Sequence, residues 1–239
     1  MSTPGFVHLD EVDSTNSEAR HRAMADEPGP LWISAARQTA GRGRRGRRWD
    51  TAAGNLAATL LLRPEAPPAM AAQLSFAAAL AVADTAQHFA PQAAVTVKWP
   101  NDVLGEGRKL AGILLESGND CGFWLAIGIG MNLAHFPDGT EFPATSLAAL
   151  GAAAPAPDAA LGVLAGRFAH WHAIWREHGF AVLREAWLSR ADHLGGPIRA
   201  RLPQEEQSGV FEGIDASGAL LLGQGPGRVR AISAAEVFW

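Results

Sequence analysis

The side chains best suited to chemistry are concentrated in one short stretch, GRGRRGRRW (41–49), which places five arginines and three glycines before a tryptophan. Each guanidinium presents a planar fork of donors that matches phosphate and carboxylate oxygens. Glycines and mutually repelling arginines disfavour a helix, so the stretch is predicted to be a loop. We expect a mobile loop that binds an anion and becomes ordered on it, with a solvated run of charge as the alternative.

A second group of ionisable residues lies in KWPND (98–102) and RKLAGIL (108–114), at the ends of two predicted strands. A lysine on its own is most often a surface residue. Lys109, however, is the first residue of a predicted strand that is too apolar to be exposed along its length. Its ammonium group is therefore expected at the end of that strand, where ligands tend to bind. Asp102 could accept a hydrogen bond from Lys109, help to hold magnesium, or merely cap the turn.

Three small polar residues, Ser14, Thr15 and Asn16, stand where a strand gives way to a helix. Thr15 and Glu18 have the spacing of a capping box, in which each side chain bonds the other residue's backbone amide. The alternative is that the polar groups hydrogen-bond a neutral polar ligand, and both roles are compatible. The sequence therefore predicts a helix start that is also a candidate binding element.

GIGMN (128–132) does not have the spacing of a dinucleotide-binding fingerprint. Its glycines are expected to let a strand pass close beneath a flat ligand, with Asn132 at the end. His170 and His172 point to different faces of a predicted helix, which disfavours a shared metal ion. The neighbouring tryptophans are expected in the core. No serine or cysteine is paired with a plausible base, so covalent catalysis by the protein is not predicted.

Composition narrows the class of protein. The chain has 239 residues, of which 48% are hydrophobic, and this is enough to form the core of one sizeable domain with a small companion. Its formal net charge is -4. This acidic balance argues against broad nucleic-acid binding. Cys121 is the only cysteine, so no intrachain disulfide can form, and it is expected to be a small buried residue or a bystander. No leader or membrane-spanning run is apparent, so we expect a cytoplasmic protein without membrane association.

Apolar periodicity predicts the elements that position these residues. A helix is expected to follow the first strand at 13–25, with others at 70–90, 161–179 and 180–194, where Gly179 suits a helix end. The predicted strands of the main body span residues 6–12, 30–38, 55–63, 95–99, 109–117 and 123–133. The gap between 95–99 and 109–117 suits a hairpin. Short strands predicted at 197–202, 209–214, 219–223 and 229–233 suggest a small β-barrel.

The motifs DSTN, QTAGRGRRGRRW, KWPND, KLAGIL and GIGMN, in this order and spacing, closely resemble the catalytic region of biotin protein ligases. The resemblance covers essentially the whole chain. It implies an α+β fold, with a mixed β-sheet catalytic domain flanked by helices over residues 1–194. That domain is related to class II aminoacyl-tRNA synthetase cores and lipoate ligases. The resemblance also implies a C-terminal SH3-like β-barrel over residues 195–239.

The resemblance further implies an ATP-dependent ligase. Biotin and ATP would give biotinyl-5'-AMP and pyrophosphate, and biotin would then pass to a lysine of a biotin carboxyl carrier protein or domain. Mg²⁺ is expected to accompany ATP. Such chemistry needs positioning and charge neutralisation, with no protein nucleophile, in agreement with the residues present. An ordered loop would also keep water from the mixed anhydride.

The resemblance assigns roles to individual residues. The catalytic residues it implies are Arg42, Arg44, Lys109 and Asp102. The biotin-binding residues it implies are Ser14, Thr15, Asn16, Gln38, Gly41, Arg42, Gly43, Arg44, Lys109 and Gly112. The ATP-binding residues it implies are Arg44, Arg45, Arg47, Trp49, Asn101, Lys109 and Asn132. Metal ligands remain unassigned.

Several alternatives stay open. The DSTN motif begins at residue 13, so we expect no N-terminal DNA-binding domain and no repressor function. A monomer and a homodimer are both plausible. The nearest rival is a lipoate or octanoate protein ligase on the same fold, although the arginine-rich loop favours biotin. A nucleic-acid-binding module would interleave aromatic with basic residues, whereas only Trp49 adjoins the loop.

Overall fold

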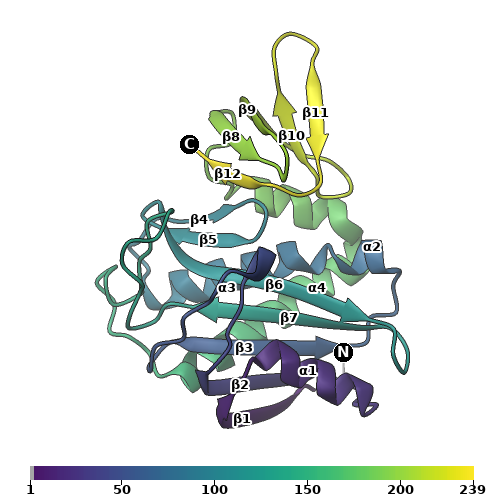
Figure 1. Cartoon of the computed structure of the whole chain (residues 1–239), viewed down its shortest axis with the longest axis vertical. Coiled ribbons are helices and arrows are strands. Elements are labelled where there is room, and N and C mark those ends of the chain that lie inside the picture. Colours follow the sequence, from purple (N-terminus) through teal and green to yellow (C-terminus); the bar gives the residue numbers. More distant parts are fainter. Residues whose placement is uncertain (1–2) are drawn as a thin grey trace.

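The structure, a computed structural model, describes residues 3–239 and contains two β-sheets (Figure 1). The larger sheet has the strand order β1-β2-β3-β7-β6-β5-β4. Its strands are β1 (Gly5–Val12), β2 (Leu31–Gln38), β3 (Leu56–Leu62), β4 (Val95–Lys98), β5 (Asp102–Gly105), β6 (Arg108–Gly118) and β7 (Trp124–Met131). β1 pairs with β2 in parallel and all other neighbours are antiparallel, so the expected mixed sheet is confirmed.

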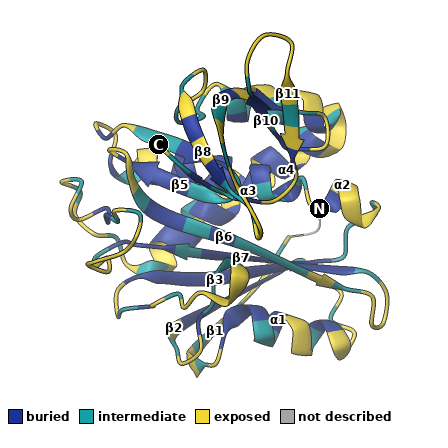
Figure 2. Ribbon diagram, turned by 45° about the horizontal axis from the view of Figure 1, so that its top comes forward, coloured by how far each residue is buried: buried dark blue, intermediate teal, exposed yellow. Residues whose placement is uncertain are grey.

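Helices cover both faces of this sheet (Figure 1). α1 (Thr15–Met24) packs on one face in a small core that includes Ala19, Ala23 and Ile33. The alanine-rich α3 (Leu74–Phe89), preceded by the short α2 (Pro68–Ala71), packs with α4 (Pro157–Leu188) on the other. Figure 2 shows the result: β3 and β7 are buried, whereas the edge strand β1 is largely exposed.

The segment Pro68–Phe89 is long and apolar enough to cross a membrane by length and composition alone. In the structure, 67% of its most apolar window is buried between the sheet and α4. A helix whose apolar surface is covered by protein has the pattern of a core helix.

The smaller sheet is antiparallel and follows α4, with the order β11-β10-β9-β8-β12. Its strands are β8 (Pro197–Arg201), β9 (Glu206–Ile214), β10 (Leu220–Gly223), β11 (Val229–Ile232) and β12 (Glu236–Phe238). Gly218, in the turn before β10, has a φ of 89°, and an added Cβ would lie 2.7 Å from Phe76. The Trp99 indole N–H donates to the Gly218 carbonyl at 3.0 Å. This turn therefore attaches the small sheet to the main body.

Three local expectations are wrong. The capping box does not form: Ser14 is the N-cap without a side-chain bond, and Glu18 pairs with Arg22 instead. Residues 95–99 and 109–117 do not make a simple hairpin, because the short strand β5 lies between them and pairs with both β4 and β6. The last helix ends at Leu188, short of residue 194.

Other expectations are confirmed or refined. Gly179 does interrupt α4, with a φ of 72°. The four predicted C-terminal strands form, but β12 was not predicted. His172 is buried and stacks on Phe168 and Trp175, and this burial lowers its pKa to about 4. Cys121 is exposed, so of its two expected roles the buried one is wrong and that of a bystander stays open.

Candidate active site

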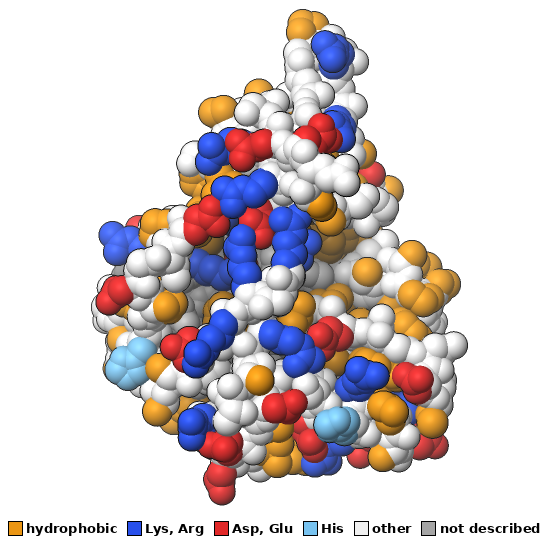
Figure 3. All heavy atoms as spheres, in the orientation of Figure 1, with side chains coloured by type: hydrophobic (Ala, Val, Ile, Leu, Met, Phe, Trp, Pro, Cys, Tyr) orange, Lys and Arg blue, Asp and Glu red, His pale blue; other side chains and the backbone are white. Residues whose placement is uncertain are grey.

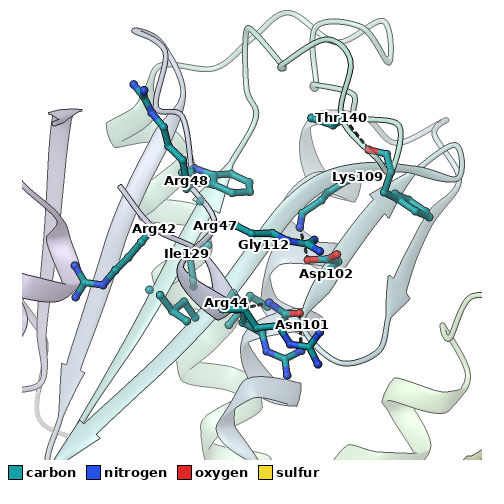
Figure 4. A pocket seen from close by; sticks show the side chains of 18 of the residues that line it. Arg42, Arg44, Arg47, Arg48, Asn101, Asp102, Lys109, Gly112, Ile129 and Thr140 are labelled. Atoms are coloured by element: carbon teal, nitrogen blue, oxygen red, sulfur yellow. Dashed lines mark hydrogen bonds and ion pairs between the residues drawn. The ribbon is translucent and has the colours of Figure 1, made fainter. Parts of the chain in front are cut away.

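A cavity of about 590 Å³ opens between the large sheet, the arginine-rich loop and β12 (Figure 4). Its volume is that of an ordinary small-molecule site. Sequence-predicted residues that line it are Ser14, Thr15, Asn16, Gln38, Arg42, Gly43, Arg44, Arg45, Arg47, Trp49, Asn101, Asp102, Lys109, Gly112 and Asn132. Gly41 does not line the cavity. It accepts a hydrogen bond from the Trp49 amide where the two ends of the loop meet.

The floor of the cavity is one row of directly opposed residues across five strands. Ala57 of β3 faces Gly130 of β7, which faces Gly112 of β6. Gly112 in turn faces Asp102 of β5, and Asp102 faces Lys98 of β4. Opposed residues in a sheet point to the same face. The row therefore changes from a flat surface without large side chains to a charged surface as it approaches β4.

Trp49 lies on the flat part of this row. A Cβ at Gly112 would be 3.1 Å from the Trp49 ring, and one at Gly130 would overlap it. Only glycine lets the indole approach the strand backbone this closely. These glycines thus let the Trp49 ring lie close to the strands, and their expected role beneath a flat ligand stays a prediction.

Neutral polar groups form the end of the cavity near α1. Gln38 Oε1 accepts from the Thr15 amide at 2.8 Å, and Thr59 Oγ1 lies 2.7 Å from both Thr15 Oγ1 and Asn16 Oδ1. The Ser14 side chain is buried nearby and makes no hydrogen bond within residues 3–239. The side chains of Thr15 and Asn16 are thus fixed by protein contacts, and the Ser14 hydroxyl is available to a ligand.

Glu116 holds Asn16 and Arg42 together, a role not predicted from the sequence. Its carboxylate accepts from Asn16 Nδ2 at 3.0 Å and from two nitrogens of Arg42 at 3.0 and 3.1 Å. Arg42 also donates to Ser17 at 2.9 Å. Its guanidinium consequently points away from Lys109 and Asp102 (Figure 4). Arg42 lines the cavity, and its guanidinium is held by Glu116 and Ser17.

Lys109 and Asp102 form an ion pair near the beginning of β6 (Figure 4). Nζ of Lys109 lies 2.7 Å from Oδ1 of Asp102, in an orientation that forms no hydrogen bond. Asp102 thus has Lys109 as its partner, as expected, but through an ion pair without a hydrogen bond. Its role toward magnesium stays a prediction. Arg44 donates to Oδ1 of the neighbouring Asn101 at 3.4 Å.

The arginine-rich loop folds back on itself as a narrow ribbon. The backbones of Arg42 and Arg48 form an isolated antiparallel β-bridge, and the short 3₁₀ turn η1 (Arg44–Gly46) lies between them. Burial and the neighbouring charge of Arg45 lower the pKa of Arg44. Glu236 of β12 offsets part of this positive charge, at 2.5 Å from Arg47 and 3.5 Å from Arg45. Figure 3 shows the cationic side chains gathered between the two sheets.

Lys98 is a further cation that was not assigned to the site. Its residue is only 7% exposed, yet it lines the cavity. Its Nζ lies 3.6 Å from the ring centre of Phe142, 4.9 Å from that of Trp239 and 5.6 Å from that of Phe238. Burial lowers the pKa of Lys98 to about 8. The sequence held one signal that could have assigned Lys98 to the site. Lys98 and Lys109 are the only lysines of the chain, beside 18 arginines.

Asn132 lies at the end of β7 but is engaged by the protein. Its side-chain amide donates to the Thr145 carbonyl at 2.9 Å, and the residue is buried. It therefore shapes the cavity wall by holding the following loop.

No group of three or more His, Cys, Asp or Glu side chains is placed to hold a metal ion within residues 3–239. Magnesium commonly binds through one or two carboxylates and substrate phosphates. Asp102 is one of the carboxylates that line the cavity, and one of its oxygens lies beside Lys109. The expected Mg²⁺ would thus enter with ATP, and it stays a prediction.

Comparison with known proteins agrees with this geometry. Residues 10–132 match the Biotin/lipoate A/B protein ligase family, and residues 193–239 match the Biotin protein ligase C terminal domain. A biotin–[acetyl-CoA-carboxylase] ligase of Paracoccus denitrificans is 48% identical over 97% of this chain and 99% of its own length. One from Mycobacterium tuberculosis is 36% identical over 98% and 89%.

The solved structures give the same result. The biotin protein ligase from Aquifex aeolicus, in complex with biotin and ATP, has a TM-score of 0.84 and 25% identity, covering 98% of both chains. The α+β fold, with its mixed sheet, flanking helices and C-terminal antiparallel sheet, is therefore confirmed as that of these ligases. On the family match and the near full-length identity together, the chain belongs to the biotin protein ligase family.

Proposed function

We propose that the cavity carries out both steps of biotin ligation: formation of biotinyl-5'-AMP from biotin and ATP, and transfer of biotin to a lysine of a carrier domain. The chain is a ligase, and biotin and ATP are its substrates, in keeping with relatives named biotin ligases and a neighbour bound to both molecules. The observation that carries the two-step proposal is the row from Gly130 to Lys98. It joins a flat surface near neutral polar groups to a charged surface.

The biotin ring fits the neutral end. A ureido group is uncharged and needs both donors and acceptors, which Ser14, Thr15, Asn16 and Gln38 supply. The valeryl chain would run over the glycine floor, and its carboxylate would reach Lys109. A lipoate or octanoate ligase would instead need an apolar end for a linear acyl chain, so the polar end favours biotin.

The charged end fits a triphosphate. In the first step, a biotin carboxylate oxygen attacks the α-phosphorus of ATP while the bond from that phosphorus to the bridging oxygen breaks, and the electron pair leaves with pyrophosphate. Lys109 would neutralise charge where the carboxylate and the α-phosphate meet, which is the kind of stabilisation that phosphoryl transfer needs. Three arginines of the loop lie toward the same end: Arg44 contacts Asn101, and Arg45 and Arg47 pair with Glu236.

The acceptor follows from the relatives' names, which identify acetyl-CoA carboxylase as their partner. We propose that the lysine of a biotin carboxyl carrier domain attacks the mixed anhydride, releasing AMP. The domain boundary at residues 194/195, the oligomeric state, the cytoplasmic location and the lack of DNA and membrane binding stay predictions.

The test is to incubate the purified chain with a purified carrier domain, ATP and biotin, and to measure the mass of the carrier. We expect one biotinyl group on one lysine, and none when that lysine is replaced by arginine. A carrier that gains lipoyl or octanoyl but no biotinyl groups under matched conditions would overturn the proposal.

A further inference from the structure

Thr59 is a fully buried polar residue beneath the neutral end of the cavity. It lies in β3 directly opposite Gly128 of β7, and Gly128 lies opposite Leu114 of β6. Asn16 lies across this second row of opposed residues, since a Cβ at Gly128 would overlap its side-chain oxygen. Asn16 and Thr15 line the cavity, whereas Thr59 is not among the described residues that line it. Thr59 can therefore act on a ligand only through these two neighbours.

The side-chain amide of Asn16 is fixed in one orientation. Its Nδ2 lies 3.0 Å from a carboxylate oxygen of Glu116 and 3.3 Å from the Leu114 carbonyl oxygen. Both partners are acceptors, so both hydrogens of Nδ2 are donated to the protein. Oδ1 then faces Thr59 Oγ1 at 2.7 Å. Because an amide oxygen can only accept, the single hydroxyl hydrogen of Thr59 is donated to Asn16.

This assignment also sets the direction of the bond between Thr59 and Thr15, whose hydroxyl oxygens are 2.7 Å apart. The Thr59 hydrogen is already used, so the Thr15 hydroxyl is the donor in this bond. Donation to Gln38 Oε1 instead, at 3.2 Å, would leave the two hydroxyl oxygens facing each other without a hydrogen between them. The bonds therefore run from Thr15 to Thr59 and from Thr59 to Asn16. Neither Thr15 nor Asn16 keeps a side-chain hydrogen for a ligand, but the side-chain oxygen of each keeps a lone pair.

On these grounds, and resting on the proposed function, we infer that Thr59 is a positioning residue that makes Thr15 and Asn16 hydrogen-bond acceptors toward biotin. A ureido ring has two N–H groups, which need acceptors, and one carbonyl oxygen, which needs donors. The oxygens of Thr15 and Asn16 suit the N–H groups, and the free Ser14 hydroxyl suits the carbonyl. A ring oxygen in place of an N–H group would face a second acceptor, and the site would reject it.

The test measures selectivity by isothermal titration with biotin and with two cyclic carbamates, in each of which an oxygen replaces one ureido N–H group. The wild-type chain is expected to bind at least one carbamate about 100-fold more weakly than biotin, because that ligand leaves polar groups of the site unpaired. Thr59→Val keeps the shape of the side chain and removes the hydroxyl, which frees the Thr15 hydrogen to turn toward the ligand. We expect biotin affinity to fall about tenfold and the preference for biotin over that carbamate to fall by a similar factor. Thr59→Ser keeps the hydroxyl and should retain the preference.

Thr85→Val is the matched control. Thr85 is equally buried, but its hydroxyl donates to the Ala81 carbonyl at 2.7 Å within α3, away from the residues that line the cavity. This variant should bind all three ligands like wild type. An unchanged preference in Thr59→Val would overturn the inference even if biotin affinity fell, because a packing defect weakens all three ligands alike. Equal wild-type affinity for biotin and both carbamates, or loss of the preference in Thr59→Ser, would also overturn it. Failure of the wild-type chain to bind biotin would instead contradict the proposed function.

Discussion

Lys109 Nζ lies 2.7 Å from Asp102 Oδ1, and the two residues belong to adjacent antiparallel strands, β6 and β5. Their side chains are only partly exposed, at 29% for Lys109 and 14% for Asp102. The pair therefore holds a compact cation at the point where the glycine floor becomes charged. Asp102 thus orients the ammonium, and we expect a substrate phosphate to compete with Asp102 for it.

Removing the Lys109 charge should stop the first step. Lys109→Met is expected to slow biotin-dependent pyrophosphate release by about 10²- to 10³-fold, the usual effect of deleting one electrostatic contact to a transition state. The adjacent Arg108, which is exposed, provides the control. Arg108→Met should release pyrophosphate at the wild-type rate. Equal rates in both variants would remove Lys109 from the mechanism.

A methyl group at Gly128 should weaken biotin binding. An added Cβ would overlap Asn16 Oδ1, which receives a 2.7 Å contact from Thr59. We expect Gly128→Ala to lower biotin affinity at least tenfold in isothermal titration, because Asn16 must leave the polar end. Gly162 in α4 has open space around its Cβ position, so Gly162→Ala should bind like wild type. Normal biotin affinity in Gly128→Ala would show that Asn16 does not matter for the ligand.

Loss of the Glu116 charge should loosen the arginine-rich loop. Glu116→Gln breaks the two-point ion pair with Arg42, and partly exposed pairs of this kind contribute about 0.2–1 kcal/mol. Trypsin should then cut within residues 41–49 up to about fivefold faster in the absence of substrates. Glu11→Gln, which breaks the remote pair with Arg37, should not change this rate. Identical cleavage in all three proteins would contradict the role of Glu116.

His172 should make the fold sensitive to acid. Its pKa is lowered to about 4 by burial, whereas an unfolded histidine titrates near 6.5, so the unfolded state binds more protons between these values. The free energy of unfolding therefore falls as pH drops from about 6.5 to about 4, by a few kcal/mol in total. In urea titrations at pH 7.5 and 5, His172→Phe should show a smaller difference than wild type. An equal difference would mean that other groups carry the acid sensitivity.

Much of the fold was predictable because apolar runs and turn residues determine it locally. The strands beside the loop and the buried α3 were found in this way. β5 and β12 were missed because they have only four and three residues, and their pairing depends on strands elsewhere in the sheet. The capping box was missed because Thr15 serves a tertiary contact with Gln38 instead of its own helix.

Site residues that belong to a recognisable sequence motif could be predicted. Site residues whose position depends on contacts between segments distant in the chain could not. The polar triplet, the loop and Lys109 were found from their own sequence. Glu236 was missed because its partner Arg47 lies 189 residues away. Lys98 was left out because its motif does not show that Phe142 and Trp239 surround it. Chain-distant contacts of this kind require the structure.

The most direct test of the central claim is ATP–pyrophosphate exchange by the purified chain with biotin, lipoate or octanoate as the added acid. The account predicts exchange that depends on biotin, is absent with lipoate and with octanoate, and is lost in Lys109→Met. No exchange with biotin, or exchange supported by lipoate or octanoate instead, would contradict the account.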